Sequence, residues 1–202
     1  MKDSKKPKTG TGALAGLKVL DFTSLLPGPY ATLCLADLGA EVLKIASPSR
    51  LDLVDLLPPH LPESGMSSAS AYLNRGKRSL ALNLKHPRAV EVVGRLVSTY
   101  DIVVESFRPG VMARLGLGYE ALAALNPAVI YCSLSGYGQT GPWRDRAGHD
   151  INYLALSGLM SYSGRKEGGP TLTGMQVADL TAGAGNTVTA ILAAVIARYR
   201  TG

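Results

Sequence analysis

Short apolar runs alternate with helix-like segments along the first two thirds of the chain, and this alternation constrains the fold most strongly. Helical patterns fall at residues 30–38, 87–99 and 119–125. The apolar runs predict five buried strands, at residues 17–23, 41–45, 79–84, 101–107 and 128–134. Strands that alternate with helices in this order predict an α/β fold, with a mostly parallel, Rossmann-like sheet flanked by helices.

The last fifty residues follow a different pattern. From residue 149 the sequence is helical, apart from a glycine-rich stretch at 164–174. Residues 180–199 are long and apolar enough to suggest a membrane span. They contain several threonines and an asparagine and are otherwise rich in alanine and glycine, so we predict a buried helix and no membrane association. Residues 46–71 form a long connection rich in proline and serine, and connections of this length are usually functional or covered by a partner.

The positive charge is unevenly distributed. Lysine and arginine exceed aspartate and glutamate by 21 − 15 = 6, but four lysines and one aspartate in residues 1–13 supply three of these charges. We therefore expect a disordered basic leader at 1–15 and one α/β domain at 16–202. The remaining charge is too weak for a nucleic-acid interface, although a small polyanion would suit it. The two cysteines, Cys34 and Cys132, are too few for a disulfide scaffold and favour a cytoplasmic protein.

Several common site signatures are absent from the sequence. The first predicted strand is followed by SLLPGPYAT, which lacks the glycine pattern of dinucleotide-binding proteins. Neither a phosphate-binding P-loop nor a G-x-S-x-G nucleophile motif occurs. The three histidines are far apart and have no metal-ligand spacing with the cysteines, so no metal site is predicted. Ligands of parallel sheets bind beyond the carboxyl ends of the strands, which directs attention to residues 24–29, 107–110 and 135–142.

Five motifs in register resemble CoA-transferase family III, also called the CaiB/BaiF type. The first is L-x-V-L-D-F-T-x-x-x-P-G-P-x-A-T-x-x-L-A-D-L-G-A-E-V-L-K-I from Leu17. The others are NRGKRSLALNLK at 74–85, ESFRPG at 105–110, RLG at 114–116 and SGYGQTGP at 135–142. The resemblance implies the N-terminal part of a large α/β domain, ending before a small second domain. It also implies an interlocked homodimer, or a second chain that supplies the missing part.

Within this family, AGHDINY at 147–153 resembles the alpha-methylacyl-CoA racemase branch. The resemblance implies that His149 and Asp179 are acid/base groups that invert the carbon next to a CoA thioester. In the CoA-transferase branch, the aspartate matching Asp179 is instead a nucleophile that forms an acyl anhydride. The structural alternatives are that Asp179 only caps a helix and that His149 is a surface or core histidine without a chemical role. Asp150 is interpreted as structural. Racemisation is the leading prediction; CoA transfer and a partner-dependent CoA-binding subunit are the alternatives.

The same resemblance suggests where CoA binds, as part of the substrate and without a metal or redox cofactor. It implies Arg114 at the phosphates, Phe107 and Tyr137 along the pantetheine, and Arg108 as either a CoA contact or an anchor. Leu26 replaces a glutamine of oxalate-type transferases and fits a hydrophobic acyl chain. The implied adenine and phosphate contacts are Leu82, Asn83 and Lys85. The basic residues expected at the lip of the site are Arg75, Lys77 and Arg78.

Overall fold

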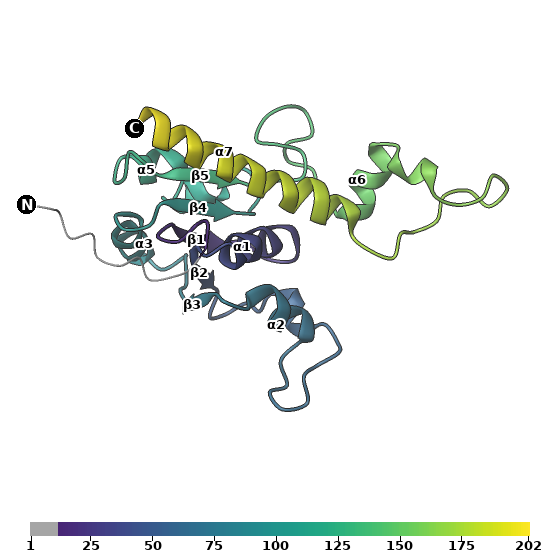
Figure 1. The fold of residues 1–202 in the computed structure, drawn as a ribbon, viewed down its shortest axis with the longest axis horizontal. Helices are drawn as coiled ribbons and strands as arrows, with labels where there is room; N and C mark the ends of the chain where they lie inside the picture. Colours follow the sequence, from purple (N-terminus) through teal and green to yellow (C-terminus); the bar gives the residue numbers. More distant parts are fainter. Residues whose placement is uncertain (1–11) are drawn as a thin grey trace, which may run out of the picture.

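A computed structural model describes residues 12–202, and its centre is a five-stranded, fully parallel sheet in the order β3-β2-β1-β4-β5 (Figure 1). The strands are β1 (Lys18–Phe22), β2 (Glu41–Ala46), β3 (Arg78–Ala81), β4 (Ile102–Glu105) and β5 (Ile130–Ser133). Each strand falls where the apolar runs predict one, so the α/β prediction is confirmed. The strand order reverses between β1 and β4, which opens a crevice at their carboxyl ends.

Seven α-helices and three short helical segments accompany the sheet in the described residues. Most of them match the predicted helical patterns, but two regions differ. The expected connection at 46–71 contains η1 and most of α2, and the four-residue α4 is too short to give a periodic pattern. The α-helices are α1 (Pro27–Asp37), α2 (Ser68–Asn74), α3 (Ala89–Val97), α4 (Val111–Arg114), α5 (Tyr119–Ala123), α6 (Asp150–Leu156) and α7 (Asn186–Thr201). The others are the 3-10 helices η1 (Leu53–Leu56) and η2 (Leu159–Tyr162) and the π-helix η3 (Ala178–Gly185).

Helices cover both faces of the sheet, because successive strand residues point to opposite sides. Leu20 of β1 faces α3, α4 and α5, whereas its neighbour Val19 faces α1 and α7. The first core includes Leu20, Phe22, Leu43, Ile45, Val93, Val97, Val103, Met112 and Leu122. The second includes Leu14, Leu17, Val19, Leu35, Val42, Ile102, Val104, Ile191 and Val195. The molecule therefore has three layers. The loops that follow the strands lie at the carboxyl edge of its sheet.

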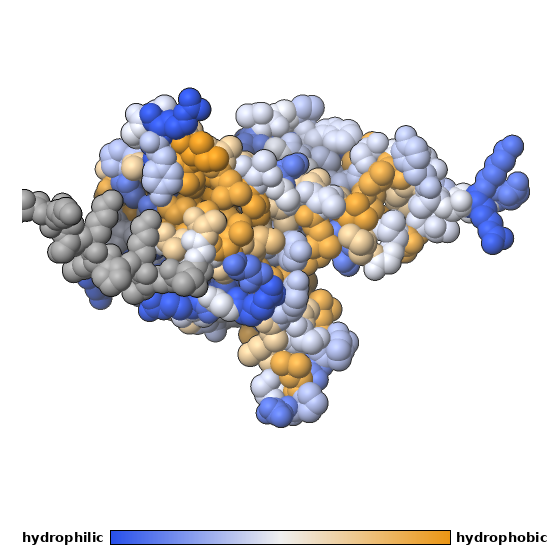
Figure 2. All heavy atoms as spheres, in the orientation of Figure 1, coloured by the Kyte–Doolittle hydropathy of each residue, from blue (hydrophilic) through white to orange (hydrophobic). Residues whose placement is uncertain are grey.

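The last two helical segments form one continuous helix, Ala178–Thr201, which is long and apolar enough by composition to cross a membrane. One such helix is weak evidence for a membrane protein, because core helices have the same composition. The structure buries one side of it, through Ile191 and Val195, whereas Ile196 and Tyr199 are exposed. The expectation of a buried helix therefore holds for one face only, and hydrophobic residues remain visible along the helix (Figure 2).

Most of the expected basic leader lies outside the described residues, since the structure begins at residue 12. Residues 12–15 are ordered against the domain. Leu14 is buried in the core beneath α1 and α7, and its N–H donates a hydrogen bond of 2.9 Å to the carbonyl of Leu38. The packed structure therefore includes residues before position 16.

Candidate functional site

The turn between β1 and α1 lies at the crevice where the strand order reverses. The N–H of Ser24 donates to the hydroxyl of Ser106, at 3.1 Å, and so ties this turn to the end of β4. Leu25 has a left-handed backbone with φ of 63°, which is unfavourable for a bulky side chain. Its N–H donates to both carboxylate oxygens of Asp52, each at 3.1 Å, and Asp52 is also paired with Lys44 at 3.6 Å. These contacts fix the position of Leu26 at the amino end of α1.

Asp179 is carried to the same place by the π-helix η3. A side chain at Gly183 would lie 2.9 Å from Cβ of Pro27, so η3 packs directly on the start of α1. Asp179 precedes Gly183 by about one helical turn and therefore lies near the start of α1. The capping residue of η3 is Val177, so Asp179 lies in the first turn of this segment and is not its cap. π-helical segments are rare and frequently occur at functional sites.

Asp150, which follows His149 in the chain, links this segment to Asp179. The carboxylate of Asp150 accepts a hydrogen bond of 2.9 Å from the N–H of Asp179. The N–H of His149 donates to the side chain of Asn152, at 2.9 Å, which fixes the start of α6. Burial raises the pKa of the Asp179 carboxyl, and the nearby Asp150 raises it further, whereas His149 lowers it. The two predicted acid/base residues therefore share one electrostatic environment.

Tyr153 also belongs to this cluster, although the sequence analysis does not single it out. It lies one turn after His149 on α6, and its ring packs edge-on against Tyr137 with centroids 5.3 Å apart. Burial raises the pKa of the Tyr153 hydroxyl, with smaller increases from Tyr137 and Asp179 and a decrease from Arg108. The four-residue spacing from His149, which places two side chains on one helix face, is the signal that could have found it.

Gly136 and Gly148 provide the space for the Tyr153 ring. A Cβ at Gly136 would overlap the Tyr153 hydroxyl oxygen, and one at Gly148 would lie 2.6 Å from a ring carbon. We therefore expect Gly136→Ala to displace Tyr153 and to lower the free energy of unfolding by about 1–3 kcal/mol, as overpacking does. Gly174→Ala is the matched control, since its Cβ would meet nothing within 4 Å. Equal denaturation midpoints for the two variants would contradict this placement of Tyr153.

Most residues predicted to bind CoA lie at the carboxyl edge of the sheet. Leu82, Asn83 and Lys85 follow β3, and the first two line a cleft of about 330 Å³ together with the start of α3. The residues after β4 and β5 lie along the same edge: Phe107, Arg108, Arg114 and Tyr137. Arg108 donates to the backbone carbonyl of Asp145, at 3.3 Å, so this residue anchors the loop after β5 whatever else it contacts.

Two arginines converge near Gly110, at the start of α4. A Cβ added to Gly110 would lie 3.3 Å from a guanidinium nitrogen of Arg114 and 3.4 Å from one of Arg144. Of these two, only Arg114 is among the predicted phosphate contacts. The two guanidinium groups beside Gly110 concentrate positive charge there. Arginine suits phosphate because its planar guanidinium presents several hydrogen-bond donors. This part of the edge is therefore well suited to an anionic ligand.

The predicted basic lip formed by Arg75, Lys77 and Arg78 does not occur at this edge. Arg75 pairs with Asp37 at the end of α1 and Arg78 with Glu41 at the start of β2, both toward the amino edge of the sheet. Arg75 also stacks on Tyr72 at 4.4 Å. Lys77 is instead directed beneath the start of α1, where it donates to the carbonyl of Pro29. Lys77 is buried, with 1% of its side chain exposed, and is paired with Asp21 at 3.1 Å. In the sequence these three cationic residues resemble an exposed basic cluster. In the folded protein each of them is paired with an acidic side chain.

The remaining nucleophilic and metal-ligating residues form no second site in the part of the chain that the structure describes. Cys34 and Cys132 are free and half-buried, and burial raises the pKa of both thiols, that of Cys132 to about 11. Both are therefore protonated near neutral pH. Among residues 12–202, no three histidine, cysteine, aspartate or glutamate side chains are placed to hold a metal ion together.

A parallel sheet with a carboxylate and an imidazole at its carboxyl edge defines an α/β protein with an enzyme-like site. The sequence profile of CoA-transferase family III matches residues 14–202, and the chain belongs to this family, whose members are enzymes. The chain is 43% identical to human succinyl-CoA:glutarate CoA-transferase and 42% identical to human alpha-methylacyl-CoA racemase. Each match covers 94% of this chain. A CAIB/BAIF family protein from Brucella suis has the same fold, with a TM-score of 0.88 and 38% identity over 95% of this chain.

The match covers only part of these relatives. The chain spans 43% of the human transferase, 46% of the human racemase and 51% of the Brucella suis protein. It corresponds to the N-terminal portion of these longer proteins, as the motifs imply. The similar identities to a transferase and a racemase do not distinguish the two reactions.

Proposed function

We propose that the protein acts in the racemisation of 2-methylacyl-CoA thioesters. The observation that carries this proposal is the placement of His149 beside Asp179, brought together from two segments by Asp150. Inversion of a carbon requires one group to remove its proton and another to return a proton to the opposite face. An imidazole and a carboxyl from different elements supply two such groups.

The proposed reaction balances without a metal or redox cofactor. One group of the pair takes the proton next to the thioester carbonyl, and the electrons of the C–H bond move into an enolate. The other group then donates a proton to the opposite face of the same carbon, and each group returns to its starting state after the reverse reaction. The raised pKa of Asp179 suits this role, because a carboxyl that titrates closer to neutral pH can both accept and donate a proton.

CoA transfer is the second candidate, and the similar human transferase favours it. In that reaction the Asp179 carboxylate attacks the thioester carbonyl, the C–S bond breaks, and CoA leaves as the thiolate while an acyl anhydride forms. The thiolate then attacks the aspartyl carbonyl of this anhydride, which releases the donor acid and leaves CoA as a thioester on Asp179. The acceptor acid attacks that thioester to form a second anhydride and release the thiolate again, and attack of the thiolate on the acceptor's acyl carbonyl forms the new CoA thioester and regenerates the Asp179 carboxylate. In either reaction we propose that the CoA-binding half works with further protein, from a second copy or another chain, in the cytoplasm.

Deuterium exchange separates these reactions. Incubated in D₂O with one epimer of a 2-methylacyl-CoA, the protein should incorporate deuterium at the α-carbon and epimerise it, as followed by NMR. His149→Ala should slow both processes by about 100-fold or more, the usual contribution of a general acid or base. His60→Ala, which changes an exposed histidine in the connection before α2, should leave the rates unchanged.

Three other outcomes would redirect the assignment. Formation of a hydroxylamine-sensitive acyl group on Asp179, with CoA appearing on an added acid, would establish the transferase reaction. CoA binding without exchange or transfer would contradict a self-sufficient enzyme and favour the partner-dependent subunit. Exchange that persists in His149→Ala would contradict the role of this histidine.

A further inference from the structure

Glu105, the last residue of β4, is a buried carboxylate at the carboxyl edge of the sheet that neither candidate reaction uses. It is 5% exposed, and its neighbours in register are Phe22 on β1 and Ser133 on β5. Among residues 12–202, no lysine, arginine or histidine forms an ion pair with it. Burial of a carboxylate without a cation is unfavourable, so the stability of the fold does not account for this residue.

The carboxylate of Glu105 holds the turn that follows β4. One of its oxygens, Oε2, accepts a hydrogen bond of 2.9 Å from the N–H of Phe107. Burial raises the pKa of Glu105, whereas the Ser133 side chain and the Phe107 N–H lower it. A donor that lowers the pKa of a carboxyl interacts with its ionised form. The turn is therefore fastened to the end of the strand by a charge-assisted hydrogen bond.

Three consecutive residues of this turn contact different parts of the site. The hydroxyl of Ser106 accepts a hydrogen bond of 3.1 Å from the N–H of Ser24 in the β1–α1 turn. Phe107 is partly buried and packs against the first core. Arg108 donates to the backbone carbonyl of Asp145 in the loop after β5. The conformation that Glu105 imposes at the start of the turn is therefore passed to loops on both sides of β4.

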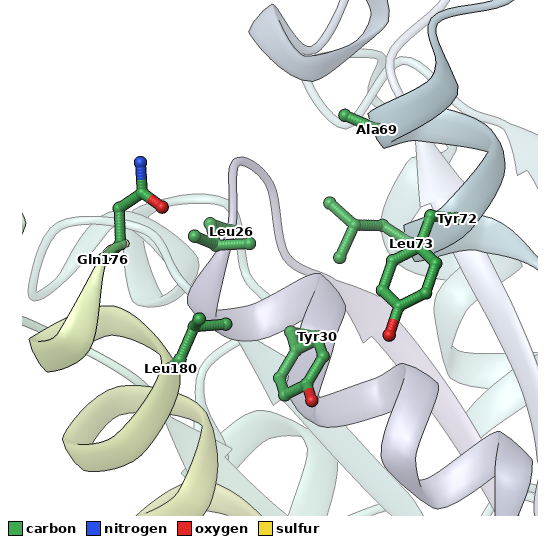
Figure 3. A pocket seen from close by; sticks show the side chains of 7 residues that line it. All are labelled: Leu26, Tyr30, Ala69, Tyr72, Leu73, Gln176 and Leu180. Carbon is green, nitrogen blue, oxygen red and sulfur yellow. The ribbon is translucent and has the colours of Figure 1, made fainter. Parts of the chain in front are cut away.

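One of these loops, the β1–α1 turn, also borders a second cleft. Leu26, two residues after Ser24, lines this cleft of about 320 Å³ together with Leu73 of α2 and Leu180 of η3 (Figure 3). The turn after β4 thus connects the edge that carries the predicted CoA contacts to the β1–α1 turn and its cleft.

We propose that Glu105 is a positioning residue that holds Phe107 in place for the pantetheine arm of CoA. The inference rests on the proposed function, because it requires a CoA thioester whose pantetheine passes Phe107. Glu105 is too buried to contact this ligand and acts through the N–H of Phe107. Phe107 itself remains partly exposed at the carboxyl edge.

Calorimetric titration of the whole chain with CoA tests this role. Glu105→Met preserves the volume of the side chain but supplies no oxygen acceptor, so the dissociation constant of CoA should rise about fivefold or more, the effect of one hydrogen bond. Adenosine 3′,5′-bisphosphate, which has the nucleotide end of CoA without the pantetheine arm, should bind unchanged. Glu105→Gln keeps an oxygen acceptor and should restore the affinity for CoA. Glu120→Ala, which removes an exposed carboxylate on α5, is the matched control and should affect neither ligand.

A double variant shows whether the effect passes through Phe107. In a Phe107→Ala protein, Glu105→Met should cause no further loss of CoA affinity, because the side chain that Glu105 positions is absent. Thermal unfolding shows whether each variant is folded, and an unfolded Glu105→Met protein would overturn the positioning role in favour of a structural one.

Three other results would also overturn the positioning role while leaving the proposed function intact. These are equal CoA affinities of the wild type and Glu105→Met, equal losses for CoA and adenosine 3′,5′-bisphosphate, and additive losses in the double variant. Failure of the wild type to bind CoA would overturn both proposals.

Discussion

Replacing Lys77 with alanine should lower the free energy of unfolding by about 3–5 kcal/mol, as the loss of one partner of a buried ion pair does. The Lys77 ammonium donates to the carboxylate of Asp21, the carbonyl of Pro29 and the hydroxyl of Thr32, at 2.7 to 3.1 Å. Asp21 is fully buried, so its charge would lose its cationic partner without access to water. Chemical denaturation measures the loss.

Two further variants identify the cause of that loss. Lys77→Met retains most of the aliphatic stem, so a similar decrease would show that the unpaired charge of Asp21 is responsible. Arg95→Ala removes an exposed partner of Glu91 on α3 and should change stability by less than about 1 kcal/mol. A change of that small size in Lys77→Ala would contradict a structural role for the Asp21–Lys77 pair.

Asp179→Asn should abolish either candidate reaction, with a fall in rate of about 100- to 10,000-fold, while the fold is retained or stabilised. The amide has nearly the same size but carries no charge beside Asp150, and the backbone N–H that Asp150 accepts from is unchanged. Asp145→Asn, an exposed aspartate in the loop after β5, should leave the rate unaltered. A loss of activity accompanied by a lower melting temperature would show that Asp179 is structural instead.

The stability difference between the wild type and Asp179→Asn should also depend on pH. The folded protein holds a proton on Asp179 at a higher pH than the unfolded chain does, because burial and Asp150 raise its pKa. The ionised carboxylate therefore destabilises the fold at neutral pH. This effect decreases as the pH falls below the folded pKa and is absent only below the pKa of the unfolded chain, where the carboxyl is protonated in both states. The groups that face it are Asp150, His149 and Tyr153. The melting temperatures of the two proteins should approach each other as the pH falls and should converge below a pH of about 4.

Local patterns predict the sheet well, because buried parallel strands are short apolar runs wherever they occur. They also place most of the CoA-binding candidates, since the residues after a strand lie at its carboxyl edge. They fail at Lys77, whose partner Asp21 is 56 positions away and whose burial depends on tertiary packing alone. The π-helix at Asp179 is not predicted either, because residues 178–185 lie within an apolar pattern that indicates only an ordinary helix.

The left-handed conformation of Leu25 has a consequence for the turn that positions Leu26. A bulky residue does not keep this conformation by itself, and here the hydrogen bonds that the Leu25 N–H donates to both oxygens of the Asp52 carboxylate maintain it. Asp52 belongs to the connection between β2 and α2, which is far from the turn in the sequence. The conformation of the β1–α1 turn therefore depends on its hydrogen bonds to a neighbouring loop more than on its own residues. A change in that loop is expected to alter the turn as well.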